Sequence, residues 1–290
     1  MFEGSMTALV TPFKKDGSID EEGLRELVDF QIENGTDVIL ATGTTGECAT
    51  LSVEEQIRAI GIVIDHVNGR RKVTAGAGAN CTREAVALTR ASKDLGADAV
   101  LSVCPYYNKP TQRGIYEHFK VVAGIDIPVI LYNVPSRTSR AIQAETILRL
   151  TELPNVVGVK EASGDLAQIM KILEGSPADF SVLSGDDSFT YSIMCLGGKG
   201  VVSVAANVMP KEVSEMVHLS LEGEYEKARE LHFRLLPLFR NLFIETNPIP
   251  VKEALRMMGK PSGVFRLPLC DMDDGHRAIL ADTLRGLGLI

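Results

Sequence analysis

The run Val156-Val157-Gly158-Val159-Lys160 is a short, apolar segment rich in β-branched residues that ends in a charged residue. Such a run is typical of a parallel strand buried on both faces. Seven similar runs occur along the chain, and most are separated by a segment with helical periodicity. The eight predicted strands are Ser5–Val10, Val38–Thr42, Val73–Ala77, Ala99–Val103, Val129–Asn133, Val156–Lys160, Ser181–Ser184 and Gly200–Val204.

Eight alternating strands and helices predict an α/β fold, the (β/α)₈ TIM barrel. The length of 290 residues lies within the usual range for one such barrel with additions. A doubly wound open sheet alternates in the same way, but it usually carries a glycine-rich dinucleotide fingerprint. Gly76-Ala77-Gly78-Ala79-Asn80 begins such a fingerprint, yet Cys81 stands where the third glycine belongs. The closed barrel is therefore the predicted fold.

The chain continues well beyond the last predicted strand, and helical periodicity persists from Pro210 onward. Three segments exceed the single helix that would close a barrel: Glu222–Phe243, Ile249–Met258 and Asp273–Gly286. We therefore predict a catalytic barrel over residues 1–225 and a C-terminal helical extension over residues 226–290.

The formal net charge of −8 argues against nucleic acid or an anionic membrane as a partner, because either would be repelled at long range. No apolar run approaches the roughly 20 residues that span a bilayer, and the N-terminus lacks a signal-peptide pattern. The five cysteines are widely spaced without a C-x-x-C pair, which indicates reduced thiols. We expect a soluble cytoplasmic protein that acts on small molecules.

In barrel enzymes the reacting groups lie at the carboxyl ends of the strands. Among the lysines, Lys160 alone ends a predicted strand, and period-two alternation directs its side chain into the barrel. Burial lowers the pKa of an amine and frees the lone pair that attacks a carbonyl carbon, which predicts a Schiff-base lysine. The alternative is a structural lysine paired with Glu161 or Asp186, although the same alternation directs Glu161 away.

Hydroxyl groups accompany this lysine at the same end of the barrel. Tyr132 ends the neighbouring strand, and Thr44 and Tyr107 occupy equivalent loop positions. Three hydroxyls in these places suggest a proton relay for imine formation and loss of water. A tyrosine that merely fills the barrel is the alternative for Tyr132.

Two features suit carboxylate groups of a substrate. Gly43-Thr44-Thr45-Gly46 presents backbone N–H groups between glycines, and Arg137 can hold a second carboxylate through two hydrogen bonds unless it is a solvated surface residue. The five histidines have no metal-ligand spacing, so we predict no metal. Asp186-Asp187 would repel a phosphate, so the substrates should be carboxylates or carbonyls.

The sequence resembles the dihydrodipicolinate synthase family of the pyruvate-dependent class I aldolases over essentially its whole length. Six segments carry the resemblance: Ala8-Leu9-Val10-Thr11-Pro12-Phe13, Gly43-Thr44-Thr45-Gly46-Glu47, Pro105-Tyr106-Tyr107-Asn108, Tyr132-Asn133-Val134-Pro135-Ser136-Arg137-Thr138, Val159-Lys160-Glu161-Ala162 and Asn247-Pro248-Ile249-Pro250-Val251-Lys252.

By this resemblance, an imine forms between Lys160 and pyruvate, its enamine condenses with L-aspartate 4-semialdehyde on the diaminopimelate route to lysine, and no separate cofactor takes part. The resemblance assigns a proton relay to Tyr132, Thr44 and Tyr107. It assigns the pyruvate carboxylate to Thr45 and the Gly185 backbone, the pocket wall to Val202, and the second substrate to Arg137. In the family the relay tyrosine comes from a neighbouring subunit, which implies a dimer and commonly a homotetramer built as a dimer of dimers.

The family's effector site is matched at Asn80, Glu84 and Tyr106. The sequence departs from the lysine-inhibited members at Val53 and Gln56, where histidines often stand, and at Cys48, where serine is common. The resemblance therefore does not carry feedback inhibition by lysine over to this chain.

Two alternatives to this function stay open. Sugar-acid aldolases of the N-acetylneuraminate lyase or 2-keto-3-deoxygluconate aldolase type share the fold and the Schiff-base lysine. Arg137 and the pair Tyr106-Tyr107 favour the semialdehyde over a sugar acid. A non-catalytic barrel that binds a keto acid is disfavoured by intact Lys160 and Tyr132, because a binding module needs no desolvated amine.

Overall fold

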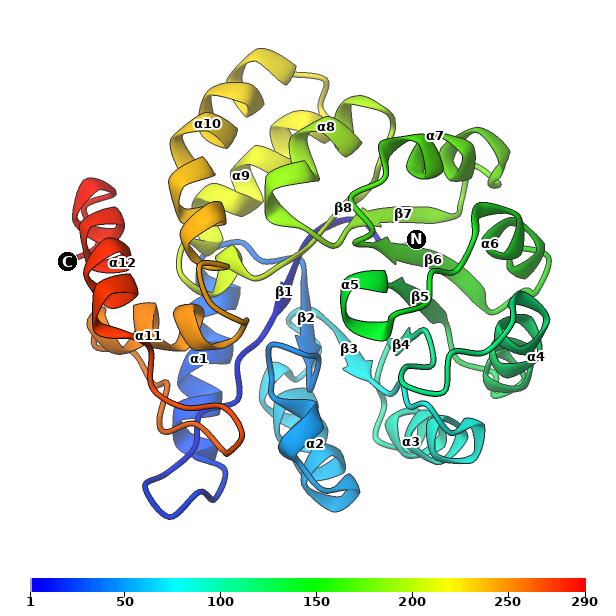
Figure 1. The fold of residues 1–290 in the computed structure, drawn as a ribbon, viewed down its shortest axis with the longest axis horizontal. Helices are drawn as coiled ribbons and strands as arrows, with labels where there is room; N and C mark the ends of the chain where they lie inside the picture. The colour runs from blue at the N-terminus through cyan, green and yellow to red at the C-terminus, as the bar shows by residue number, and fades with distance from the viewer. Residues whose placement is uncertain (1) are drawn as a thin grey trace.

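Eight parallel strands close into a barrel in the computed structural model, which describes residues 2–290. The strands pair in sequence order, and the last pairs with the first. Figure 1 shows the helices as a ring around the strands. The predicted (β/α)₈ barrel is therefore confirmed. The strands are β1 (Gly4–Ala8), β2 (Val38–Ala41), β3 (Lys72–Gly76), β4 (Ala99–Val103), β5 (Val129–Asn133), β6 (Val156–Glu161), β7 (Ser181–Ser184) and β8 (Gly200–Ser203).

Helices connect the strands and extend the chain beyond the barrel. Within residues 2–290, no helix is both long and apolar enough to cross a membrane. The helices, with short 3₁₀ turns marked η, are α1 (Glu21–Glu33), η1 (Cys48–Thr50), α2 (Val53–Val67), α3 (Thr82–Asp94), α4 (Gln112–Ala123), α5 (Pro135–Thr138), α6 (Ala144–Leu150), α7 (Leu166–Gly175), η2 (Asp187–Phe189), α8 (Thr190–Cys195), η3 (Ala205–Asn207), α9 (Pro210–Leu221), α10 (Tyr225–Asn241), α11 (Ile249–Met257) and α12 (Asp274–Gly286).

Several strand boundaries differ from the prediction by one or two residues. β1 ends at Ala8 because the Val10 N–H donates to Asn207 Oδ1 at 3.1 Å instead of to a neighbouring strand. β2 ends one residue early because Thr42 adopts a left-handed φ of 55°. β3 begins at Lys72 and ends at Gly76, so both of its ends lie one residue before those of the predicted range Val73–Ala77. β6 continues one residue further than predicted, and β8 ends one residue earlier.

Alternation along the strands divides the apolar side chains between two cores. One cluster fills the inside of the barrel and includes Met6, Leu40, Leu101 and Leu183. The larger cluster lies between the strands and the surrounding helices. Tyr132 belongs to the inner cluster, so the strand pattern itself turns its phenol toward the barrel interior.

The C-terminal helices pack outside the barrel ring. α12 contacts both α10 and α11, and α11 contacts η3. Figure 1 shows α11 and α12, in orange and red, on the same side of the molecule as α1. α10 begins at Tyr225, beside the domain boundary that the sequence suggested; the division into two domains stays a prediction.

A fully buried ion pair joins this extension to the barrel. Lys252 of α11 and Glu47 of the loop after β2 lie 2.5 Å apart, and the side chains of both are 0% exposed. The ammonium also donates to the carbonyls of Val264 at 2.8 Å and Thr11 at 3.3 Å, so its three protons are all used. The ring of Phe13 lies 4.8 Å from the same nitrogen. The extension is therefore anchored at the loop that follows β2.

Removing one partner of this pair should be strongly destabilising. Glu47→Ala leaves the Lys252 ammonium buried without its counter-charge, and we expect a loss of about 3–5 kcal/mol in the free energy of unfolding. Denaturant unfolding monitored by circular dichroism measures the change. The double variant Glu47→Gln/Lys252→Met should recover a large part of the loss.

The matched control is Asp282→Ala, which removes the partner of Arg285 in an exposed ion pair. That substitution should change stability little, because solvent screens such a pair. Equal effects of Glu47→Ala and Asp282→Ala would show that the buried pair is not an anchor.

Candidate active site

A cavity of about 310 Å³ opens where the strands end at their carboxyl termini. Its wall includes Gly43 after β2, Gly78 after β3, Val103 of β4, Tyr132 of β5 and Lys160 of β6. The volume is in the range of small-molecule sites, and this end of the barrel is where barrel enzymes place their chemistry.

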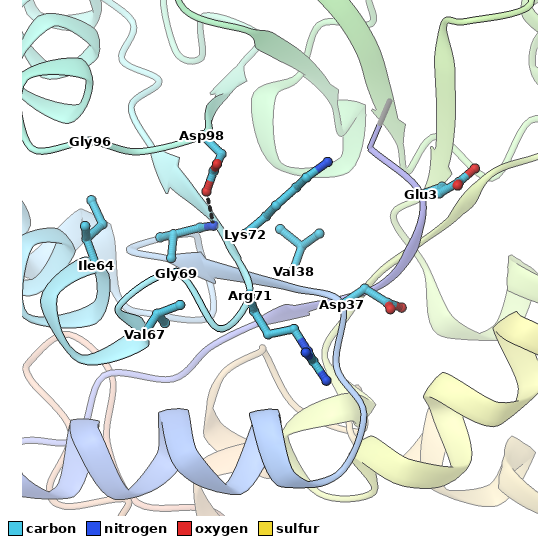
Figure 2. Close-up of a pocket in the computed structure, with 11 residues that line it drawn as sticks. Glu3, Asp37, Val38, Ile64, Val67, Gly69, Arg71, Lys72, Gly96 and Asp98 are labelled. Carbon is cyan, nitrogen blue, oxygen red and sulfur yellow. Dashed lines mark hydrogen bonds between the residues drawn. The ribbon is translucent and has the colours of Figure 1, made fainter.

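A larger hollow, of about 510 Å³, lies at the opposite end of the barrel near the first residues of β2 and β3 (Figure 2). Two of its three acidic side chains, those of Asp37 and Asp98, accept hydrogen bonds from the backbone. The Asp98 carboxylate accepts from the Val73 N–H at 2.7 Å, and the Asp37 carboxylate accepts from the Ser5 N–H at 2.8 Å. This end of a barrel is typically structural, so we assign the hollow no chemistry.

Lys160 is the reactive candidate in the smaller cavity. It pairs in register with Tyr132 of the neighbouring strand, so both side chains lie on the inner face of the barrel. Lys160 is 5% exposed, and its Nζ lies 4.3 Å from the centre of the Tyr132 ring. Among residues 2–290 it forms no ion pair.

Burial lowers the pKa of Lys160 to about 8. The negative charge of Asp187 raises this pKa and the positive charge of Arg137 lowers it, but both effects are smaller than that of burial. The amine is thus substantially neutral near pH 8, which is the form that attacks a carbonyl group.

Neither carboxylate suggested as a structural partner is paired with Lys160. Glu161 is buried on the other side of the strand, where it accepts from Asn133 Nδ2 at 2.8 Å and Gln168 Nε2 at 3.0 Å. Asp186 accepts from the backbone N–H and the hydroxyl of Ser188. The acidic group that acts on the lysine is instead the adjacent Asp187.

Asp187 is a residue whose role the sequence did not indicate. It is 2% exposed, and its carboxylate accepts from Ser203 Oγ at 2.5 Å and from the N–H groups of Val204 and Ala205 at 3.0 Å each. These donors come from the end of β8 and the start of η3. Burial raises the pKa of the Asp187 carboxyl group, and the hydrogen bonds from these donors oppose that shift by stabilising the carboxylate form.

The hydroxyl groups of the predicted relay have different surroundings. Burial raises the pKa of Tyr132 to about 12, and a hydrogen bond with the Thr44 side chain lowers it. Thr44 and Tyr132 both line the cavity. Tyr107 is 90% exposed and does not line this cavity of its own chain. Two of the three hydroxyls are therefore brought together within one chain.

Tyr107 is the central residue of a tight turn. The Asn108 N–H donates to the Tyr106 carbonyl at 2.9 Å, and Tyr107 has a φ of 69°. A three-residue turn with positive φ is strained for a residue with a large side chain. The loop therefore holds an aromatic ring outward in a conformation that costs free energy.

The loop after β2 has the geometry of an anion cradle. The N–H groups of Gly46 and Glu47 close back onto the carbonyls of Gly43 and Thr44, each at 3.0 Å. Within the described chain, the N–H groups of Thr44 and Thr45 are left without a backbone acceptor. This pattern agrees with the carboxylate-binding concavity predicted from the sequence.

Arg137 lines the same cavity, and its guanidinium is hydrogen-bonded to a residue of the C-terminal extension. Its Nη2 donates to the backbone carbonyl of Asn247 at 3.2 Å. The Asn247 side chain in turn donates from Nδ2 to Thr45 Oγ1 at 3.0 Å. Arg137 therefore lies at the cavity wall with one hydrogen bond to the extension, but its side chain is exposed, so its role in holding a carboxylate stays a prediction.

One predicted contact, that of the Gly185 backbone N–H, is corrected by the structure. The Gly185 N–H donates to the Glu161 carbonyl at 2.8 Å, so it is already used and does not serve as a carboxylate donor. A Cβ at Gly185 would lie 3.1 Å from Lys160 Cγ and 2.6 Å from Ala162 Cβ, so the glycine makes room for the lysine. Val202 lies in the inner cluster of the barrel and, like Thr45, is not among the residues that line the cavity, so both assignments stay predictions.

The predicted effector residues lie partly in the same cavity. Glu84 and Tyr106 line it, together with Val53 and Gln56, whereas Asn80 is not part of the wall. The backbone carbonyl of Asn80 accepts a hydrogen bond from the Asn108 side chain at 2.9 Å. The effector assignment stays a prediction.

Within residues 2–290, no group of three or more His, Cys, Asp or Glu side chains is arranged to hold a metal ion. The chemistry that the cavity offers is that of a buried amine, a phenol, a threonine hydroxyl and a guanidinium. A parallel barrel with this set at its carboxyl end defines a candidate Schiff-base lyase.

The comparisons with known proteins agree with this class. The model of the dihydrodipicolinate synthetase family matches residues 1–287. The chain is 53% identical over 292 residues to the 4-hydroxy-tetrahydrodipicolinate synthase of Methanocaldococcus jannaschii, covering 100% of each sequence. The crystal structure of dihydrodipicolinate synthase from Aquifex aeolicus matches with a TM-score of 0.98 at 51% identity, covering 99% of each chain.

A structure described as the first monomeric dihydrodipicolinate synthase variant matches with a TM-score of 0.97 at 41% identity, covering 100% of this chain and 98% of that one. The chain belongs to the dihydrodipicolinate synthetase family. The family resemblance inferred from the sequence is therefore confirmed.

The pKa of Lys160 sets an expected pH dependence for imine formation with pyruvate. Only the neutral amine attacks, so the rate should rise with pH and level off above about 8. Asp187→Asn removes a charge that raises this pKa, and the midpoint should move to lower pH. Borohydride trapping followed by mass spectrometry measures the rate at each pH.

Asp186→Asn is the matched control, because Asp186 is adjacent in sequence but is not a cause of the Lys160 shift. Its midpoint should stay where it is in the unchanged chain. A midpoint near the ordinary lysine value of 10.5 in the unchanged chain would contradict the buried-amine interpretation.

Proposed function

We propose that this chain catalyses the 4-hydroxy-tetrahydrodipicolinate synthase reaction, in which pyruvate condenses with L-aspartate 4-semialdehyde. The observation that carries the proposal is the buried Lys160 amine in register with Tyr132, at the mouth of a barrel whose full-length relatives have this name. The chain is thus a lyase, and no separate cofactor is invoked because the imine is formed with a substrate.

The reaction begins when the neutral amine of Lys160 attacks the C2 carbonyl of pyruvate. Loss of water gives the imine, and loss of a methyl proton gives the enamine. The enamine carbon attacks the aldehyde carbon of the semialdehyde, whose oxygen takes up a proton. The amino group of the second substrate then attacks C2, which closes the ring and releases Lys160, so that one water is lost overall.

Each of these steps moves a proton, and Tyr132 is placed to carry it. Its phenol keeps its proton because its pKa is about 12, so it can donate to the leaving water and be restored through Thr44. Tyr107 would complete the relay from a second copy of the chain. Its exposed side chain and its strained turn support this assignment, since strain of this kind is typical of functional positions.

The two substrate carboxylates require separate donors. The N–H groups of Thr44 and Thr45 and the Thr45 hydroxyl would hold the carboxylate of pyruvate. Arg137 would hold the carboxylate of the semialdehyde through its planar fork. We infer that the bound pair is oriented by these two anchors, with Lys160 between them.

A shared active site requires at least a dimer, and a homotetramer built as a dimer of dimers would contain two such pairs. A solved relative is described as a monomeric variant, so membership of the family does not by itself fix the assembly. The exposed Tyr107 is the feature of this chain that favours a dimer.

A coupled assay that offers different aldehydes tests the substrate. With pyruvate present, we expect turnover with L-aspartate 4-semialdehyde and little with sugar-derived aldehydes. Arg137→Ala should reduce use of the semialdehyde by roughly 10²-fold while pyruvate still forms its adduct at Lys160. Preference for a sugar-derived aldehyde would overturn the proposed function in favour of a sugar-acid aldolase.

Subunit mixing tests the shared site. Tyr107→Phe should reduce turnover by roughly 10²–10⁴-fold without unfolding the chain, and Lys160→Ala should abolish it. A hybrid of the two variants contains one site with both the lysine and the tyrosine, so part of the activity should return after subunit exchange. Tyr225→Phe, at another partly exposed tyrosine, is the control and should leave turnover unchanged. Verified hybrids without activity would contradict the shared site.

A further inference from the structure

Asn247 is a buried residue that contacts both groups assigned to the substrate carboxylates. It lies between α10 and α11, outside the barrel strands, and is 5% exposed. Its side-chain Nδ2 donates to Thr45 Oγ1 at 3.0 Å, and its backbone carbonyl accepts from Arg137 at 3.2 Å. One residue of the C-terminal extension therefore joins the two anchors.

The hydrogen bond to Thr45 determines what that hydroxyl can do. A threonine hydroxyl has one proton to donate and two lone pairs to accept with. Since Asn247 donates to the oxygen, the proton of Thr45 is left to donate elsewhere. Thr45 is 2% exposed, so no bulk water competes for that proton. The hydrogen bond from Asn247 thus leaves the Thr45 hydroxyl oriented to donate its proton to an anion.

The other half of the Asn247 amide is unsatisfied. Within residues 2–290, Oδ1 is buried and has no hydrogen-bond partner. An unpaired buried acceptor is costly, and an apolar side chain of similar size would avoid that cost. Packing therefore does not explain why residue 247 has an amide side chain. A requirement for the N–H donor of that amide does explain it.

Both ends of the contact are fixed by the same buried ion pair. Glu47 follows Thr45 by two residues, and Lys252 follows Asn247 by five residues. The bond between Lys252 and Glu47 therefore holds the two segments against each other directly beside the Asn247–Thr45 contact. A hydrogen bond in this setting has little freedom to shift.

We propose that Asn247 is a positioning residue for substrate binding: its side chain orients the Thr45 hydroxyl toward the pyruvate carboxylate, and its carbonyl holds Arg137 for the second carboxylate. The proposal rests on the proposed function for the identity of the two carboxylates. It assigns a part of the active site to the C-terminal extension, which supplies no residue to the cavity wall.

The test measures pyruvate binding alone, through the concentration dependence of borohydride trapping at Lys160. Asn247→Ala removes the side-chain donor but keeps the backbone carbonyl. We expect the half-saturating pyruvate concentration to rise about tenfold, with a much smaller change in the KM of the second substrate. An unchanged pyruvate dependence would overturn the proposal.

The matched control is Asn241→Ala. Asn241 also donates from its side chain to a threonine hydroxyl, that of Thr283 at 2.6 Å, within the same extension but away from the cavity. It should lower the unfolding temperature without altering the pyruvate dependence. If both variants weaken pyruvate binding equally, Asn247 acts only through the stability of the extension, and the proposal fails.

A double-mutant cycle tests the path through Thr45. Thr45→Val should weaken pyruvate binding in the unchanged chain, and it should add little when combined with Asn247→Ala, because the oriented hydroxyl is then already lost. Independent, multiplicative effects would contradict the proposed path. Asn247→Asp keeps the size of the side chain and serves if the alanine variant does not fold. Its carboxylate would accept the Thr45 proton, so the half-saturating pyruvate concentration should rise by more than about tenfold relative to the unchanged chain.

These measurements separate the two proposals. Trapping uses pyruvate without an aldehyde, so a chain that binds pyruvate as expected but prefers another aldehyde would fail the proposed function and leave the role of Asn247 intact. The absence of any pyruvate adduct in the unchanged chain would overturn both.

Discussion

The site depends on keeping one amine away from water without a carboxylate in direct contact with it. Lys160 is 5% exposed, and within the described residues it forms no ion pair, so the ammonium form is disfavoured. Lowering its pKa from 10.5 to about 8 corresponds to about 3 kcal/mol between the two protonation states. The apolar inner cluster and the room left by Gly185 supply this environment. An ion pair with Glu161 would stabilise the ammonium form of Lys160 and raise its pKa. Strand alternation prevents that pair, because it places Glu161 on the other side of the strand.

The barrel alone does not complete the site. The loop after β2 is short and rich in glycine, and its position is fixed by Asn247 and Lys252, which lie 202 and 205 residues from their partners in the sequence. Lys252 holds Glu47 at one end of the loop, and Asn247 holds Thr45 within it. A buried ion pair is a weak source of net stability compared with apolar packing, but it strongly favours one arrangement over others. The extension thus fixes the positions of residues in the loop after β2, although it does not itself line the cavity.

The fold and the main catalytic candidate could be predicted because both follow from local patterns. Apolar runs with period-two alternation give the strands and the direction of Lys160, whatever the distant partners are. Asp187 could not be predicted as a buried charge, because its three donors come from another strand end. Asn247 was noted only as part of a family motif, since its contact spans 202 positions. The Gly185 N–H was misassigned because its acceptor, the Glu161 carbonyl, lies on the adjacent strand.

Arg137 links the chemistry of the amine to the order in which two anionic substrates bind. Its positive charge lowers the pKa of Lys160 and that of Tyr132. While the guanidinium has no bound carboxylate, it therefore favours the neutral amine that pyruvate needs. A carboxylate bound to Arg137 would offset that charge and return the amine toward its protonated form, which hinders attack. After the imine has formed, a carboxylate bound to Arg137 becomes favourable, because it stabilises the positive charge of the protonated imine. The electrostatics thus favour pyruvate as the first substrate and the carboxylate-bearing aldehyde as the second.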